Sequence, residues 1–83
     1  MQITFKLYAT LSDYLPEGTE KNATVINIPE DASAYNVIDR FNVPREKAHL
    51  VLLNGIYIHP EDRNNPIFKE GDTLAIWPPV AGG

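Results

Sequence analysis

The chain has 83 residues, of which 43% are hydrophobic and 22% are charged, and this size and composition fit a single compact domain. Its formal net charge of -4 argues against nucleic acid as a ligand, because binding to a phosphate backbone draws on clustered cations. There is no cysteine, which excludes disulfides, thiolate zinc sites and thiol nucleophiles within the chain. A domain of this size buries only about 60 to 65% of the surface of its unfolded chain, so it has little room to enclose a substrate. We therefore expect a protein that is not an enzyme.

No apolar run approaches the ~18 residues of a membrane span. Residues 1–6 also lack the charged start and apolar stretch of a signal peptide. We expect no membrane partner and a cytoplasmic location.

Residues 2–9 alternate between apolar and more polar side chains, and this period of two predicts a half-buried strand. One side would hold Ile3, Phe5 and Leu7, and the other would hold Thr4, Lys6 and Tyr8. Residues 9–15 then predict one or two helical turns before Pro16 and Gly18.

Residues 23–28 are rich in β-branched side chains and predict a second strand that returns antiparallel to the first. Ser33 is a candidate N-cap, and the apolar spacing after it predicts a helix over residues 34–41 that ends at Val43-Pro44. This is the one full helix that the sequence predicts.

The second half of the chain predicts three short strands. Residues 50–53 form an apolar run typical of a strand inside a sheet, with much of its surface covered, and the turn dipeptide Asn54-Gly55 follows. Residues 56–58 continue as a strand, residues 59–66 read as a polar surface loop, and residues 73–77 form the last strand.

This order of elements predicts an α+β fold with one main helix on a mixed sheet, and the β-grasp or ubiquitin-like arrangement fits it best. Residues 1–79 would form the β-grasp domain, and residues 80–83 a flexible Gly-Gly tail.

The tail carries the most informative chemistry. Pro78 and Pro79 have no backbone N–H to donate to a sheet, so they would end the last strand. Their extended backbone would direct Val80, Ala81 and the two glycines away from the body of the domain. Small side chains can thread a narrow tunnel, and the glycines let the backbone approach a nucleotide closely. A carboxylate at Gly83 would need activation, for example adenylation, before a sulfur nucleophile could attack it. The competing interpretation is an ordinary flexible terminus, since termini are often rich in small residues.

Residues 70–83 resemble the closing motif of the MoaD/ThiS family of sulfur carriers, a Gly-Asp turn and an apolar strand that run into Pro-Pro-Val-Ala-Gly-Gly. The resemblance extends to residues 6–16 and 49–55 and so covers most of the chain, whereas residues 59–66 look longer and more polar than the usual connection. The ending is most similar to that of the molybdopterin synthase small subunits in this family.

The resemblance implies a protein cosubstrate rather than a catalyst. Gly83 would carry the sulfur as a thiocarboxylate, Gly82 would give clearance, and residues 78–81 would guide the tail into a partner. The implied partners are an adenylyltransferase of the ubiquitin-activating type, which uses Mg-ATP, a sulfur donor, and an acceptor such as the large subunit of molybdopterin synthase. No cofactor would be bound by the chain itself.

Other functions stay open at this point. Relatives with similar tails serve thiamine, cysteine or tRNA thiolation pathways, a ubiquitin-like modifier would join Gly83 to lysines, and a purely structural domain would have an inert tail.

Tyr8, Tyr57 and Trp77 are candidates for an apolar docking patch on the sheet, with core packing as the alternative. Acidic residues could assist docking to a basic partner, or could be ordinary surface charge; they are Asp13, Glu17, Glu20, Glu70 and Asp72.

We expect no metal site, because His49 and His59 have no cysteine or carboxylate cluster at ligand spacing. The pairs Glu30-Asp31 and Glu61-Asp62 lie in polar loops and read as solvated charges or turn formers rather than catalytic carboxylates.

Overall fold

The computed structural model describes residues 1–19 and 21–80. Within these residues, five strands form one sheet in the order β2-β1-β5-β3-β4, and one α-helix lies against it. The strands are β1 Gln2–Leu7, β2 Ala23–Asn27, β3 Leu50–Leu53, β4 Ile56–Tyr57 and β5 Thr73–Trp77; the helix is α1 Ala34–Arg40; the short 3-10 helices are η1 Ala9–Tyr14, η2 Arg45–Lys47 and η3 Pro60–Asp62.

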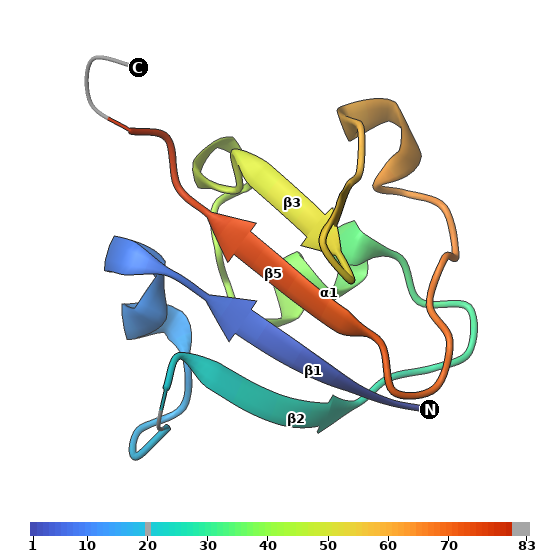
Figure 1. The fold of residues 1–83 in the computed structure, drawn as a ribbon, viewed down its shortest axis with the longest axis horizontal. Helices are drawn as coiled ribbons and strands as arrows, with labels where there is room; N and C mark the ends of the chain where they lie inside the picture. The colour runs from blue at the N-terminus through green and yellow to red at the C-terminus, as the bar shows by residue number, and fades with distance from the viewer. Residues whose placement is uncertain (20, 81–83) are drawn as a thin grey trace.

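The sheet is mixed. β1 pairs antiparallel with β2 and parallel with β5, and β3 pairs antiparallel with both β4 and β5. The first and last strands of the chain therefore lie side by side at the centre of the sheet, as Figure 1 shows. The prediction of an α+β, ubiquitin-like β-grasp fold with one main helix is confirmed.

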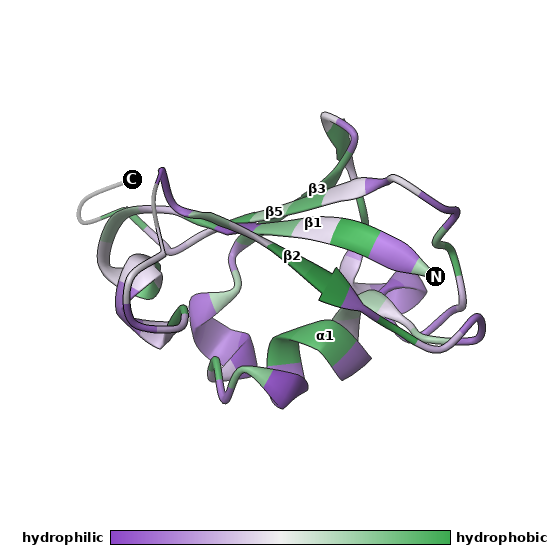
Figure 2. Cartoon of the chain, turned by 90° about the horizontal axis from the view of Figure 1, so that it is seen from below, coloured by the Kyte–Doolittle hydropathy of each residue, from purple (hydrophilic) through white to green (hydrophobic). Residues whose placement is uncertain are grey.

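The core lies between one face of the sheet and α1, the arrangement seen in Figure 2. Alternate residues of each strand point to this face, as the period of a pleated strand requires. The most deeply buried of them are Ile3, Phe5, Leu7, Val51, Leu74 and Ile76, each at most 1% exposed. The predicted apolar side of the first strand is therefore the core side.

The helix begins where the sequence predicts. Ser33 is the N-cap: its hydroxyl accepts a hydrogen bond from the backbone N–H of Asn36 at 3.2 Å, and the Asn36 side chain accepts one from the N–H of Ser33 at 2.9 Å. This reciprocal pair satisfies two of the donors that a helix start leaves free. At the other end Phe41 is the C-cap, and Asn42 takes a positive φ of 62° that ends the helix.

The turn at Asn54-Gly55 is also confirmed. Both residues have positive φ, as a tight hairpin turn requires, and they connect β3 to β4. The Asn54 side chain donates to the Asp72 carboxylate and accepts from the N–H of Thr73, each at 2.9 Å. The hairpin is thereby tied to the start of β5.

Two expectations are corrected. The segment 59–66 is not a wholly exposed loop, because it contains η3 and because Arg63 is only 4% exposed. The expectation that the apolar run of β3 is covered is corrected at one residue: Val51 is in the core and Leu52 and Leu53 are half-buried, but Leu50 is 36% exposed. The run is continuous because both faces of this strand are apolar, and only one of them is covered by the helix.

Candidate functional site: the outer face of the sheet and the tail

The face of the sheet opposite α1 carries an apolar patch. We call it the docking face and define it by the residue after β1 and by side chains from the three strands β3, β4 and β5: Tyr8, Leu50, Leu52, Tyr57, Ala75 and Trp77. The strand registers place these side chains together, since residues that pair directly across a ladder point to the same face.

The centre of the docking face is an aromatic stack. The rings of Tyr8 and Trp77 lie 4.0 Å apart between centroids and are inclined by only 3°. Trp77 pairs with Leu50 across β5 and β3, so the stack continues into an exposed leucine. Aromatic and aliphatic groups left half exposed on one face are typical of a protein interface. Tyr8 and Trp77 therefore belong to the outer face and not to the core.

Ala9 follows Tyr8 directly and has a φ of 52°, in the left-handed region that a non-glycine residue adopts only at some cost in free energy. This conformation turns the chain from β1 into η1. The N–H of Tyr8 donates to the carbonyl of Ile76 at 3.1 Å, which keeps Tyr8 in the ladder beside β5. The strained turn at Ala9 therefore comes directly after the residue whose ring stacks on Trp77.

Tyr57 lies at the edge of the docking face. It pairs with Leu52 across β4 and β3 and is 41% exposed. Its ring packs edge-on against His59, with centroids 5.0 Å apart, and its hydroxyl accepts a hydrogen bond from Arg63 at 3.2 Å. The structure therefore brings all three aromatic residues singled out in the sequence to one face, with Tyr57 held by the segment that follows it.

The tail leaves from the end of the docking face. β5 ends at Trp77, as the two prolines predict, and Pro79 and Val80 are exposed, Val80 by 75%. The predicted sulfur-carrying Gly83, with Gly82 and Ala81, lies outside the described residues. The last described residues therefore follow directly on the aromatic stack.

The acidic candidates fall into two groups. Asp13 and Glu17 are exposed in and after η1, which follows the end of β1 and contacts β1 and β5. Glu70 and Asp72 lie before β5, at the other end of the sheet: Glu70 accepts from the N–H of Gln2 at 2.9 Å, and Asp72 accepts from the N–H of Lys69 at 2.7 Å. These two carboxylates organise the turn into β5. Glu20 lies outside the described residues.

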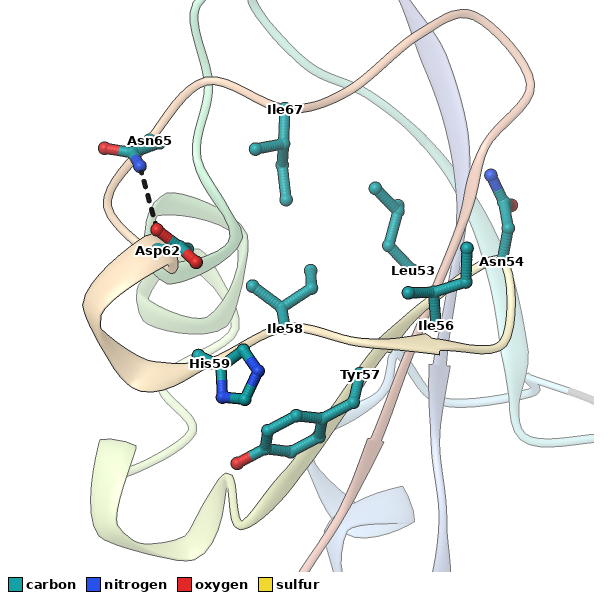
Figure 3. Close-up of a pocket in the computed structure, with 9 residues that line it drawn as sticks. All are labelled: Leu53, Asn54, Ile56, Tyr57, Ile58, His59, Asp62, Asn65 and Ile67. Atoms are coloured by element: carbon teal, nitrogen blue, oxygen red, sulfur yellow. Dashed lines mark hydrogen bonds between the residues drawn. The ribbon is translucent and has the colours of Figure 1, made fainter.

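An open hollow of about 480 Å³ lies beside β4 and the segment after it, as shown in Figure 3. Leu53, Ile56, Ile58 and Ile67 give it an apolar lining, and Asp62 at its rim accepts a bond from Asn65 at 3.5 Å. Tyr57 and His59 also line the hollow, but none of the hydrogen bonds among the described residues pairs a nucleophile with a base there. Among the described residues, no group of three His, Cys, Asp or Glu side chains could hold a metal ion.

A perturbed carboxyl lies on the helix side of the molecule. The Arg45 guanidinium donates two hydrogen bonds to Asp39, the shorter at 2.7 Å, and they lower the pKa of that carboxyl below its usual value. The same pair raises the pKa of Arg45. Both groups lie at the end of α1 or after it, away from the docking face, so their titration is a matter of stability rather than of the site.

Comparison with known proteins defines the class. The chain is similar in structure to SAMP1 from Haloferax volcanii, with a TM-score of 0.69 and 22% identity over 100% of both chains. It is similar to the HVO 2177 protein of Haloferax volcanii, with a TM-score of 0.78 and 20% identity over 100% of this chain and 87% of that one. It also matches a chain in the complex of subunits 1 and 2 of the molybdopterin-converting factor from Helicobacter pylori 26695, with a TM-score of 0.61 and 19% identity over 100% of both chains. At these identities the likeness establishes a shared ubiquitin-like fold.

The sequence itself gives the family. The model of the ThiS family matches residues 7–83, nearly the whole chain, whereas no curated protein sequence matches it. The chain therefore belongs to the ThiS family, whose members are small sulfur carrier proteins and not catalytic enzymes. The predicted membership of the MoaD/ThiS family of ubiquitin-like sulfur carriers is confirmed. In the part of the chain that the structure describes, no helix is long and apolar enough to cross a membrane.

Sequence reasoning missed two parts of the site. The sequence of residues 50–53 predicts a strand with much of its surface covered, and only the β3–β5 register places Leu50 and Leu52 beside Trp77 and Ala75 on the open face. Arg63 lies in a segment of polar sequence, and none of its neighbours in the sequence distinguishes it from an exposed arginine.

Proposed function

We propose that this chain carries sulfur on its C-terminus, as a thiocarboxylate formed at Gly83. Family membership supports the carrier role, and the observation that carries the proposal is the continuity between the docking face and the tail. A partner that covers Tyr8 and Trp77 would receive residues 78–83 in its own site, because β5 runs from that face directly into the two prolines.

The proposed chemistry has two steps, both in the partner's site. An oxygen of the Gly83 carboxylate attacks the α-phosphorus of Mg-ATP, which forms an acyl-adenylate and releases pyrophosphate. A sulfide equivalent then attacks the acyl carbon, the bond to AMP breaks, and the thiocarboxylate remains on the chain. The mixed anhydride is prone to hydrolysis, so the tail must be enclosed while it is activated. Two glycines give the backbone the clearance that such an enclosed site demands.

We assign the sulfur to molybdopterin, for the molybdenum or tungsten cofactor. The Pro-Pro-Val-Ala-Gly-Gly ending and the similarity to the molybdopterin-converting factor complex support this assignment. The partners would be an adenylyltransferase, a sulfur donor and a large synthase subunit that accepts the sulfur. A cytoplasmic location fits such soluble partners and remains a prediction.

The test is reconstitution with an adenylyltransferase of the ubiquitin-activating type, ATP and sulfide, followed by intact-mass measurement. We expect a mass increment equal to the replacement of one oxygen by sulfur, located in the C-terminal peptide. Deletion of Gly82-Gly83 should abolish it, and Val80→Ala should retain it, because that variant keeps the length and the terminal carboxylate.

Failure of the wild-type chain to gain sulfur, with an enzyme that activates another carrier of this family, would contradict the proposal. Conjugates to lysines would favour a protein modifier. An acceptor assay with the large subunit of molybdopterin synthase then tests the pathway, and lack of transfer to it would leave the carrier role but remove the molybdopterin assignment.

A further inference from the structure

Arg63 is a buried cation whose side chain no step above uses. It follows η3, and its side chain is 4% exposed. Its guanidinium donates to the carbonyls of Ile58 at 2.9 Å, Ala48 at 3.1 Å and His49 at 3.4 Å, and to the Tyr57 hydroxyl at 3.2 Å. The backbone carbonyl of Arg63 also accepts from the N–H of Tyr35, which ties this segment to the helix.

The surroundings of Arg63 are neutral. Over residues 1–19 and 21–80, no carboxylate lies within ion-pair distance of it, and all its hydrogen bonds go to carbonyls and a phenol. A buried charge without a counter-charge is unfavourable unless its donors are well satisfied. A planar guanidinium can reach several acceptors at once in a fixed geometry, which neither an ammonium nor an apolar side chain can do. Arg63 can therefore hold several groups in fixed positions relative to one another.

Two sets of contacts made by the Arg63 guanidinium connect it to residues of the docking face. One is direct, through the Tyr57 hydroxyl, with the Arg63 guanidinium 5.6 Å from the centre of the Tyr57 ring. The other runs through the backbone: Arg63 binds the carbonyls of Ala48 and His49, and the N–H of His49 donates to the carbonyl of Trp77 at 3.0 Å. Trp77 is the last strand residue before the tail.

We infer that Arg63 is a positioning residue that fixes Tyr57 and the Trp77 end of β5 in the arrangement that the activating partner recognises. This inference rests on the proposed function. It gives a role to the segment 59–66, which holds this buried arginine. Pre-organised interface side chains lower the free-energy cost of binding, because less rotamer freedom is lost in the complex.

The chain offers a matched control in Arg40. Its guanidinium also donates to a backbone carbonyl, that of Asn27 at 2.6 Å, and also lies near an aromatic ring, that of Phe41 at 5.8 Å. Arg40 is exposed, however, and its contacts lie at the helix end and at the end of β2, not on the docking face. Arg40→Met and Arg63→Met thus remove similar groups from the two sides of the molecule.

The experiment measures the adenylation of the full chain by pyrophosphate release, as a function of chain concentration, well below the melting temperature of every variant. We expect Arg63→Met to raise the KM for the chain about tenfold, less than the loss of a full interface hot spot, with kcat unchanged. Arg63→Lys should recover part of the loss, and Tyr57→Phe, which removes one bond and keeps the ring, should raise KM less. Arg40→Met should match the wild type.

The outcomes separate the two claims. Active wild-type chain with equal KM values for Arg63→Met and Arg40→Met would overturn the positioning role and leave the proposed function intact. A lower melting temperature for Arg63→Met without a change in KM would show a purely structural role and overturn it as well. If Arg63→Met does not fold, the KM for Arg63→Lys is compared with that for Arg40→Met instead, and equal values would again overturn the positioning role. If the wild-type chain is never adenylated, the proposed function fails and the inference falls with it.

Discussion

The two faces of the sheet use the same strands for different purposes. On the helix side, Phe5, Leu7 and Leu74 are fully buried. On the opposite side, Leu50 and Tyr57 remain 36% and 41% exposed, and Tyr8 and Trp77 stack at the surface. Both faces carry apolar side chains, but only those of the first are covered by the chain itself.

Apolar character alone therefore does not distinguish the residues that stabilise the fold from those that are open to a partner. Alternation along a strand sends each second side chain to the core and leaves the others on the open face, where we propose that a partner docks. A substitution on the helix side should therefore lower the free energy of unfolding, whereas one on the docking face should mainly weaken adenylation. The following changes test that division.

Phe5→Ala should have the largest effect. The ring is fully buried and packs against Phe41 with centroids 4.8 Å apart, so its removal leaves a cavity in the core. We expect a loss of about 3–5 kcal/mol in the free energy of unfolding, which a denaturant titration would measure. A loss below about 1 kcal/mol would mean that the helix side does not carry the fold.

Trp77→Ala should show the opposite pattern. We expect the KM for the chain in adenylation to rise about thirtyfold, because a central aromatic residue of an interface often contributes about 2 kcal/mol. Stability should fall by only about 1 kcal/mol, the scale of the lost stack with Tyr8. Val25→Ala is the control on the same face, since Val25 is 59% exposed on the edge strand β2. Equal KM values for the two variants would remove Trp77 from the docking face.

Ser33→Ala should affect stability alone. The substitution removes the hydroxyl of the capping box at the start of α1 and should cost about 1 kcal/mol in the free energy of unfolding. The rate of adenylation at saturating chain should stay at the wild-type value. Thermal unfolding and pyrophosphate release, measured on the same samples, would check both parts.

Asp39→Asn should have the smallest effect, confined to a range of pH. Hydrogen bonding to Arg45 lowers the pKa of Asp39 below 3.8, so the ion pair contributes stability above that value and loses it as pH falls through the lowered pKa. The pair is about half exposed, which keeps its contribution small. The difference between wild type and Asp39→Asn should be present near neutral pH and vanish in strong acid, as unfolding titrations over pH would show. A difference that does not change with pH would point to a cause other than this ionisation.

Local signals were enough to predict most of the fold. The alternation over β1, the capping residue Ser33 and the Asn54-Gly55 turn all depend on neighbouring residues, and each is confirmed. The face occupied by Trp77 could not be settled in this way. It depends on the parallel register between β1 and β5, which joins the two ends of the chain.

The burial of Arg63 is a second case in which local sequence was insufficient. Its segment is polar and contains two prolines, which is typical of an exposed loop. The acceptors that make burial possible come from Ala48, His49, Tyr57 and Ile58. Their meeting depends on how β3, β4 and the following segment pack, and no spacing in the sequence encodes it directly.

The most direct test of the account is the mass of the C-terminal peptide from protein isolated from its native cells. We predict a fraction of chains in which one oxygen at Gly83 is replaced by sulfur, and a loss of this fraction when the adenylyltransferase is removed. Chains that carry only an unmodified carboxylate, in cells that contain an active adenylyltransferase and are making the sulfur-containing product, would contradict it.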